Sequence, residues 1–465
     1  MDHLGGWIDS LEAAVFTRVP LLGVEIELIV LWLAFPMLFF TAWLGFPNLR
    51  GLGIAIRDLR ESAREKTAPG QVSQFAALTT AISGTVGLGN IAGVAVALTV
   101  GGPGAAFWMF VIGWFAMTLK CAEVTLGLRF REETADGRIR GGPMYTLKNG
   151  FATKGWAKLG LVLGGFYAAF ALIGALPMLQ VNQSYVAVAA AADWTDGTGV
   201  RWTYGAVMAF LVAFVVLGGV TWLGRVTSYL VPLMAIVYLT GVFAILALNV
   251  SAIPAAVALI VSDAFTGQAV AGGAIGAFVV GMRRAVFSSE AGIGSAVIAH
   301  AQARTRVPAS EGMVALLEPF IDTVVICSLG ALAMVVAGTY NQGLEGVEIT
   351  SAAFEQVAPW FPAVLAIAVF LFGFSTLCAW GFYGLQSWGY LFGDSRAAQY
   401  TFKALYVLLL PIGAVLDLGR VVGLIDSAFF LMAIPNIIAL YLFAPDLKRE
   451  ISAYIQARKR GERQS

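Results

Sequence analysis

Charge is scarce in this sequence of 465 residues. Asp, Glu, Lys and Arg together make up 12% of the chain, about half of the ~25% that is usual in soluble domains. Hydrophobic residues make up 59%, and the mean hydropathy is +0.81. This balance excludes an ordinary soluble domain and predicts a multi-pass protein of the cell membrane, in contact with membrane lipid. The net charge of +1 gives no sign of a nucleic-acid partner.

Cysteine and histidine are also scarce, with three and two residues. Cys121, Cys327 and Cys378 lie in apolar segments without the spacing of a metal site, so we interpret them as small buried hydrophobic residues. His3 and His300 leave little room for a zinc or haem site, and we expect no cofactor. The sequence also lacks His-Glu-x-x-His, Gly-x-Ser-x-Gly and Walker-type motifs, which argues against an enzyme and against an ATP-driven pump.

Long apolar runs dominate the rest of the sequence. A transmembrane helix needs about 20 mostly apolar residues, and about eleven runs of that kind are present. They lie near residues 21–46, 74–100, 103–128, 159–190, 204–222, 226–249, 266–298, 311–337, 357–390, 402–417 and 421–444. We therefore predict an all-α, polytopic membrane protein.

The basic residues alternate between the loops that join these runs. Loops 47–73 and 129–158 are rich in Lys and Arg, as is the C-terminal tail, whereas the loops on the other side hold only Arg18, Arg201 and Arg420. Cytoplasmic loops carry the excess of Lys and Arg in membrane proteins. We therefore predict an N-terminus outside the cell and a C-terminus in the cytoplasm.

Two of the runs are interrupted by glycine. The second contains ISGTVGLGNIAG, residues 82–93, and the seventh has small residues at Gly272, Gly273 and Gly276. Because these runs lie five crossings apart, they cross in opposite directions, which is the pattern of a transporter built from two inverted repeats. The predicted domains are an extra N-terminal helix with a cytoplasmic loop (1–73), a first five-helix repeat (74–249), a second, inverted five-helix repeat (266–445) and a basic cytoplasmic tail (446–465).

The interruptions have two explanations. Small residues let membrane helices pack closely. Alternatively, unwound backbone inside a bilayer is tolerated where it lines a cavity, and its free N–H and carbonyl groups can hold a carboxylate or a cation. Two interruptions at matching positions, with Ser83, Thr85 and Asn90 among the glycines of the second run, favour a binding site.

Several motifs then point to a family. They are TTAISGTVGLGNIAGVA, GGPGAAFWMF, KCAEVTLGLRFRE, GGPMYTL, FSSEAGIGSA and GFSTLCAWGFYG. In this order they resemble the alanine or glycine:cation symporter family over about residues 74–445. Ser289 stands where asparagine is more usual in the family. The resemblance implies a leucine-transporter-type fold, coupling to sodium or in some members to protons, and small neutral amino acids as substrates.

The resemblance also implies a sodium site between the second and ninth runs. Its ligands are the carbonyl groups of Ser83, Val86 and Phe372 and the hydroxyl groups of Ser375 and Thr376. Such oxygen ligands suit a hard cation, although a hydroxyl group in a helix can also bond to its own backbone. Asn90 either adds an oxygen to a second sodium site or caps the broken helix.

The substrate site is expected beside the sodium site. The substrate carboxylate should meet the backbone N–H groups around Thr85, Gly87 and Gly89. Gln180, in the fourth run, has an amide that offers two donors and an acceptor to an amino acid. The other explanation for Gln180 is a hydrogen bond to a neighbouring helix.

A bulky side chain is expected at the edge of the substrate pocket. Trp380 lies four residues after Thr376 and so on the same helical face, where it either limits the size of the substrate or only packs. Thr376 should touch the substrate as well as the ion. We expect Ile275, Gly276 and Phe278 of the seventh run on the facing wall.

Several charged residues lie within the runs. Asp322 is midway along the eighth run, and intramembrane carboxylates mark ion paths or ion pairs. It is a cation ligand, a proton acceptor or a partner of Arg283 or Arg284, and the sequence does not choose between these roles. Lys120 and Glu123 are three residues apart, which favours a structural ion pair.

The sequence thus predicts a secondary symporter that imports alanine or glycine with sodium or protons by alternating access. The alternatives are a cation-coupled symporter for another small solute and an ion channel, although no filter-like repeat of a channel is present. The choice between alanine and glycine, D or L preference, the coupling ion and its stoichiometry, and the oligomeric state stay open.

Overall fold

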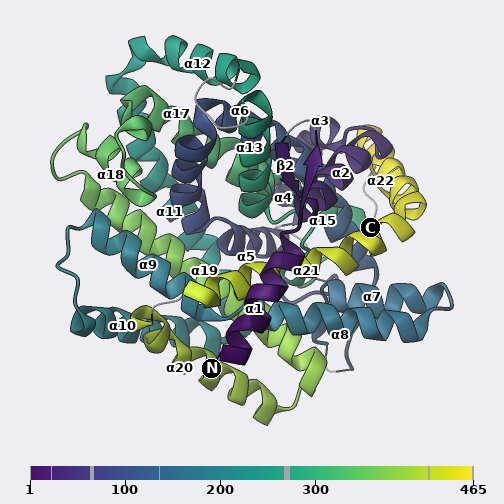
Figure 1. Cartoon of the computed structure of the whole chain (residues 1–465). Coiled ribbons are helices and arrows are strands. Elements are labelled where there is room, and N and C mark those ends of the chain that lie inside the picture. The colour runs from purple at the N-terminus through teal and green to yellow at the C-terminus, as the bar shows by residue number, and fades with distance from the viewer. Residues whose placement is uncertain are drawn as a thin grey trace.

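The computed structural model describes residues 2–21, 24–62, 67–135, 137–266, 273–416 and 419–462. Most of these residues are helical, and the helices pack into one body without a large sheet (Figure 1). The strands in the described part of the chain form two antiparallel pairs, β1 (Arg18–Leu21) with β2 (Val24–Glu27) and β3 (Glu132–Glu133) with β4 (Ile139–Arg140).

The chain begins with a helix and a hairpin rather than with a membrane-spanning run. The first elements are α1 (Asp2–Val15), the β1–β2 hairpin, α2 (Leu28–Trp43), α3 (Pro47–Arg50) and α4 (Leu52–Ser62). The run predicted at 21–46 is therefore wrong at its start, because the alternation of Val, Glu, Ile and Glu at 24–27 is a strand pattern. In the strand register of the hairpin, Glu27 lies opposite Arg18.

The second run is broken where the sequence predicts it. α5 (Gln74–Thr85) and α6 (Leu88–Arg129) are separated by Val86 and Gly87. α6 covers both the second and the third predicted runs and turns a corner at Gly102, where φ is +66°. Glycine adopts this left-handed conformation without the steric cost that other residues meet.

The fourth run is also divided in two, which the sequence analysis did not predict. The helices that follow the third run are α7 (Pro143–Thr153), α8 (Ala157–Gly174), α9 (Pro177–Ala191), α10 (Thr198–Leu217), α11 (Gly219–Leu248), η1 (Val250–Ala252) and α12 (Ile253–Thr266). The gap between α8 and α9 precedes Pro177 because proline lacks an N–H group and disfavours helical backbone in the residue before it. α12, another unpredicted helix, is too short to have been read as a membrane-spanning run.

In the seventh run, one of the three predicted glycines lies inside a helix. Gly272 lies outside the described residues, and α13 (Gly273–Ser289) passes through Gly276 without a break. The helix ends at Glu290, whose φ is +49°, and Gly292 follows with a φ of +95°. Gly273 is the first residue of α13 and has a φ of +62°. The prediction was wrong at Gly276, because glycine inside a helix costs only about 1 kcal/mol, so composition alone does not distinguish a packing glycine from a turning one.

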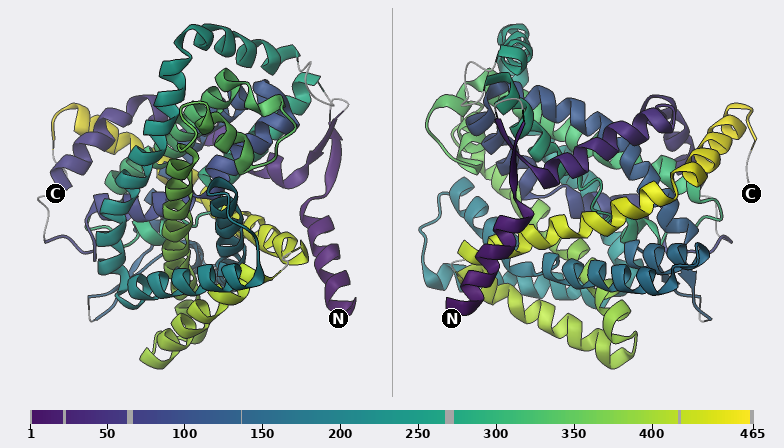
Figure 2. Two further views of the ribbon diagram at one scale, coloured as in Figure 1. Left: turned by 90° about the vertical axis from the view of Figure 1, so that its left-hand side faces the viewer. Right: turned by 45° about the vertical axis from the view of Figure 1, so that its right-hand side comes forward.

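The remaining helices complete the body. They are α14 (Val297–His300), α15 (Pro308–Ala315), α16 (Leu317–Pro319), η2 (Phe320–Cys327), α17 (Ser328–Ala337), η3 (Thr339–Asn341), α18 (Val347–Glu355), α19 (Pro362–Phe392), α20 (Arg396–Val415), α21 (Gly419–Leu442) and α22 (Ala444–Lys459). The stretch η2 is π-helical, a geometry often found at functional positions. α12 and α20 lie at opposite ends of the body, and α1 runs beside α21 (Figure 2).

The exterior of the body is apolar. In the described residues, eight helices are long and apolar enough to cross a membrane, and one of them, Gly89–Arg129, covers two predicted runs. Large apolar side chains such as Phe210, Leu233 and Leu408 are exposed on these helices, which is unfavourable in water and favourable in lipid. The chain is therefore a multi-pass membrane protein. The number of eleven crossings, the inverted repeat and its domain boundaries stay predictions.

Candidate functional site

The break between α5 and α6 forms the centre of the candidate site. Val86 and Gly87 have non-helical backbone, with ψ of 90° and −158°. The Gly87 N–H group donates to the side-chain oxygen of Asn90 at 3.3 Å, and the Asn90 amide donates to Ser288 Oγ at 3.3 Å. Asn90 therefore caps the broken helix, which is one of its two predicted roles, and it also joins α6 to α13.

A buried hydroxyl group of α19 faces this break. A Cβ atom added to Gly87 would lie 2.9 Å from Thr376 Oγ1, so only glycine permits this close approach. Thr376 is 2% exposed, and its hydroxyl group has no hydrogen-bond partner among the described residues. Because an unsatisfied buried polar group costs about 1–3 kcal/mol, a ligand atom at this point would be stabilising.

The other predicted sodium ligands gather around the same contact between α5 and α19. Ser83 Oγ donates to the carbonyl oxygen of Ser375 at 2.7 Å, and Ser375 Oγ donates to the carbonyl oxygen of Phe372 at 2.9 Å. The Ser375 hydroxyl group thus bonds to its own helix, whereas that of Thr376 does not. All four residues and Val86 are buried, and their carbonyl and hydroxyl oxygens are of the kind that a hard cation takes.

The start of α6 provides donors for an anion. The Thr85 hydroxyl group makes two long hydrogen bonds, at 3.4 Å, to carbonyl groups of its own helix. Gly89 is exposed, and a Cβ atom there would meet nothing within 4 Å. The first N–H groups of a helix have no intrahelical partners, and this end of the helix is electrostatically positive. The N-terminus of α6 can therefore hold a carboxylate.

Gln180 is on α9, a helix that packs against α19. Ser184, one turn after Gln180 on the same helical face, lies against Gly373 of α19. The part that Gln180 plays in the site stays a prediction.

An aromatic cluster lies one helical turn beyond Thr376. Trp380 packs against Tyr383 and Phe429, with ring centroids 5.4 and 5.6 Å away. Phe287 stacks on Phe429 at 6.3 Å. The sequence analysis did not single out Phe287, although it is the first residue of the FSSEAGIGSA motif, which could have identified it.

The predicted facing wall lies at another level of the molecule. Phe278 packs on Trp108, with ring centroids 4.9 Å apart, whereas Ser288 is the residue of α13 that reaches the break. At about 1.5 Å per residue, Ile275 and Gly276 lie roughly 18–20 Å along the helix from Ser288. The structure does not bring Ile275, Gly276 and Phe278 to the break, because the interruption of this run occurs at its other end.

Asp322 joins the site through hydroxyl groups. It is buried in η2 and accepts hydrogen bonds from Ser288, at 3.2 Å to either oxygen, and from Thr323 at 3.4 Å. Arg283, one of its predicted partners, pairs instead with Glu27 at 2.9 Å. Two of the predicted roles, cation ligand and proton acceptor, fit these surroundings.

A second buried polar network lies further along α6. Lys120 pairs with Glu318 at 3.2 Å, not with Glu123 as predicted. His300 lies between Glu318, at 3.4 Å, and Glu311, at 2.6 Å. The spacing of three residues places Lys120 and Glu123 on one face of α6. The prediction was wrong because Glu318, from another helix, packs against that face and forms the ion pair with Lys120.

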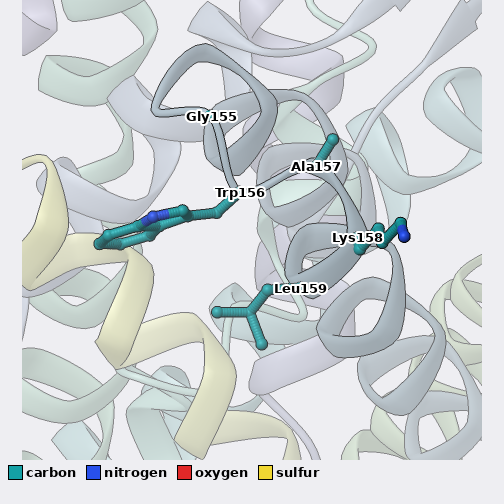
Figure 3. Close-up of a pocket in the computed structure, with 5 residues that line it drawn as sticks. All are labelled: Gly155, Trp156, Ala157, Lys158 and Leu159. Atoms are coloured by element: carbon teal, nitrogen blue, oxygen red, sulfur yellow. The ribbon is translucent and has the colours of Figure 1, made fainter.

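A surface hollow at the start of α8 is separate from this site. It has a volume of about 430 Å³ and is lined by the single stretch Gly155 to Leu159. Figure 3 shows the side chains of Trp156 and Leu159 along it, with that of Lys158 directed elsewhere. Because polar groups from several elements usually converge in a binding site, we assign this hollow no function.

The fold and the broken helix together define a class. The structure resembles that of MhsT in complex with L-phenylalanine, with a TM-score of 0.54 and 16% identity over 83% of this chain and 99% of that one. It also resembles a Na⁺-coupled sialic acid symporter, with a TM-score of 0.50 and 13% identity over 90% of this chain and 83% of that one. The fold is therefore that of a membrane transporter of the leucine-transporter type.

The chain belongs to the sodium:alanine symporter family, whose model matches residues 12–465. It is 37% identical over 427 residues to "Sodium/alanine symporter AgcS" of Methanococcus maripaludis, covering 91% of this chain and 93% of that one. It is 32% identical over 438 residues to "Probable sodium/glutamine symporter GlnT" of Bacillus subtilis, covering 94% and 89%. The family resemblance predicted from the motifs is confirmed, and because the family and these relatives are transporters, so is the prediction that the chain is not an enzyme.

Proposed function

We propose that this protein is a secondary active symporter that imports small neutral amino acids, alanine or glycine, together with sodium ions or protons. The observation that carries the proposal is the buried hydroxyl group of Thr376, which lies opposite the broken helix at Gly87 and has no hydrogen-bond partner among the residues that the structure describes. The names of the family and of AgcS support the choice of alanine and sodium.

The coupling ion binds between α5 and α19. Its ligands are the carbonyl groups of Ser83, Val86 and Phe372 and the hydroxyl groups of Ser375 and Thr376. Sodium takes oxygen ligands of this kind, and the inward movement of one charge across 100 mV releases about 2.3 kcal/mol. That free energy drives the uptake of substrate against its gradient.

The amino acid binds beside the ion. Its carboxylate accepts hydrogen bonds from the N–H groups around Thr85, Gly87 and Gly89 at the positive end of α6. Gln180 provides a polar contact from α9, and Trp380 limits the length of the substrate side chain. Ion and substrate stabilise the same broken segment, so each strengthens the binding of the other.

The site is reached from each side of the membrane in turn. The broken helices occupy matching positions in two inverted repeats, and one bundle of helices rocks against the other around a fixed site. The loops rich in Lys and Arg lie in the cytoplasm, which places the N-terminus outside and the C-terminus inside.

Uptake by purified protein in liposomes tests this function. With an inward sodium or proton gradient, radiolabelled alanine or glycine should accumulate above its external concentration. When both gradients are collapsed, accumulation should stop, and accumulation that continues would contradict symport. A channel would let the substrate equilibrate without accumulating. Competition by unlabelled glutamine tests the alternative of another small solute, which the name of GlnT raises.

A further inference from the structure

A basic pocket lies where α19 ends and α20 begins, on the side of the molecule that the distribution of Lys and Arg assigns to the cytoplasm. Its volume is about 450 Å³. The lining residues are Arg138, Asp394, Arg396, Gln399, Tyr400 and Lys403. Three of these side chains are cationic and one is anionic, so the pocket carries an excess of positive charge.

The carboxylate in this pocket is already engaged by its neighbours. Arg138 and Arg140 lie 3.2 and 3.0 Å from the same oxygen of Asp394. The Gln399 amide donates to the other oxygen at 2.7 Å. Asp394 therefore cannot also neutralise the cations at the beginning of α20.

Within the described ranges of the chain, Lys403 is a cation without a counter-ion. Its residue is 8% exposed, and its ammonium group lies 5.8 Å from the centre of the Tyr400 ring. In the part of the chain that the structure describes, neither Lys403 nor Arg396 forms an ion pair. Burying a charge without a partner is unfavourable, so the pocket has the electrostatics of a site for an anion.

The orientation of α20 adds to this effect. Ser395 caps the helix by accepting the N–H group of Ala398 at 3.2 Å, and the helix continues for 20 residues, to Val415. Its positive end and its first N–H groups therefore point toward the pocket.

An apolar stripe leaves the pocket along the exposed face of α20. Tyr400, Leu408 and Ile412 follow each other at helical spacing, with Leu405 beside them, and all four side chains are exposed. From Tyr400 to Ile412 the stripe is roughly 18 Å long at 1.5 Å per residue. This is close to half of the ~30 Å thickness of the hydrocarbon core of a bilayer.

From these contacts we propose that the pocket binds the phosphate group of an anionic phospholipid in the cytoplasmic leaflet. The phosphate lies between Lys403, Arg396 and the first turn of α20, and the acyl chains lie along the apolar stripe. Basic pockets between membrane helices on the cytoplasmic side are suited to acidic lipid headgroups. A free phosphate ion would neutralise the cations but would not cover the apolar stripe.

Native mass spectrometry of the delipidated protein, titrated with phosphatidylglycerol, tests the proposal. We expect Lys403→Gln and Arg396→Gln to bind this lipid at least tenfold more weakly than the wild type. Lys403→Arg, which keeps the charge, should bind like the wild type. Lys158→Gln is the matched control, because Lys158 is an exposed basic residue outside the pocket, and it should also bind like the wild type.

Three outcomes would overturn the proposal. One is equal lipid binding by the wild type and by folded Lys403→Gln and Arg396→Gln. Another is equal binding of zwitterionic phosphatidylcholine by the wild type. The third is displacement of the lipid by excess inorganic phosphate, which would assign the pocket to a free anion. Lipid binding is measured without transport, so none of these results bears on the symport proposal.

Discussion

The hydroxyl groups of Ser375 and Thr376 are adjacent in the sequence but differ in their surroundings. The Ser375 group donates to the Phe372 carbonyl oxygen. The Thr376 group is buried opposite Gly87 and finds no hydrogen-bond partner in the described part of the chain. At the scale of single residues, Thr376 is therefore the side chain whose unused oxygen is available to an ion.

Replacing Thr376 with valine should weaken sodium binding. Valine keeps the shape and the β-branch and removes only the oxygen. We expect the apparent sodium affinity of uptake to fall at least tenfold, on the order of 1.4 kcal/mol, and alanine affinity at saturating sodium to change less, because the substrate keeps its own contacts. Uptake measured against sodium concentration checks this. Overlapping curves at equal amounts of protein in the membrane would exclude Thr376 from the ion site.

Shortening Trp380 should broaden substrate selection. The indole ring lies near Gly174, 3.6 Å from the position of an added Cβ atom, and contacts Tyr383 and Phe429. Trp380→Ala should therefore admit larger neutral amino acids and weaken the binding of alanine. One methylene group at the edge of a pocket changes the binding free energy by about 1–3 kcal/mol. Competition by a series of neutral amino acids measures this change.

Trp380→Phe is measured in the same experiment because it keeps an aromatic ring. Removing the buried ring altogether, as in Trp380→Ala, costs about 3–5 kcal/mol of stability. An intermediate profile for Trp380→Phe is expected. If both folded variants show the wild-type competition profile, Trp380 has only a packing role.

At the scale of the elements, function depends on a helix that is interrupted at one place. α5 ends and α6 begins close to Thr376 of α19, so the backbone groups freed by the interruption lie near the hydroxyl group of that residue. The contact requires that position 87 have no side chain, because a Cβ atom there would lie 2.9 Å from Thr376 Oγ1.

Gly87→Ala should therefore impair transport more than Gly89→Ala. The methyl group at position 87 would push α5 and α6 away from α19 and disturb the ion site, and we expect at least a tenfold loss of sodium affinity. At position 89 an added Cβ atom meets nothing within 4 Å, so it serves as the matched control for the loss of a glycine. Equal sodium dependence of the two variants would show that the close approach at Gly87 is unimportant.

At the scale of the whole molecule, membrane orientation can be measured by cysteine labelling. The native cysteines Cys121, Cys327 and Cys378 are all buried, so background labelling should be low. Thr195 and Lys459 are exposed and lie in regions predicted to face opposite sides of the membrane.

A membrane-impermeant maleimide should label Thr195→Cys on intact cells and should not label Lys459→Cys. After the cells are permeabilised, both variants should be labelled, because both positions are exposed in the folded protein. We expect this difference on intact cells because the loops on the side of residue 459 carry the excess of Lys and Arg that marks the cytoplasm. The reverse pattern would show that the orientation is opposite to the predicted one.

The sequence by itself determined that the protein is a membrane transporter of this family and where one of its helices is broken. Composition and the length of apolar runs suffice to identify a membrane protein, because every backbone group in lipid needs a hydrogen-bond partner within its own segment. The motifs, in the order of the family, then identify the transporter family. The motif around Gly87 suffices for the second, because glycines and polar residues are concentrated there. Both are local properties of the chain.

Only the tertiary structure decided which groups meet. It placed the second interruption at Glu290 rather than at Gly276, brought Phe287 instead of Phe278 toward Trp380 through Phe429, and paired Lys120 with Glu318. Each of these contacts joins residues of different helices, and the relative position of packed helices depends on the shapes of all the side chains between them. The FSSEAGIGSA motif singles out Phe287 and Glu290, but no local pattern in the sequence states which residues of other helices they meet.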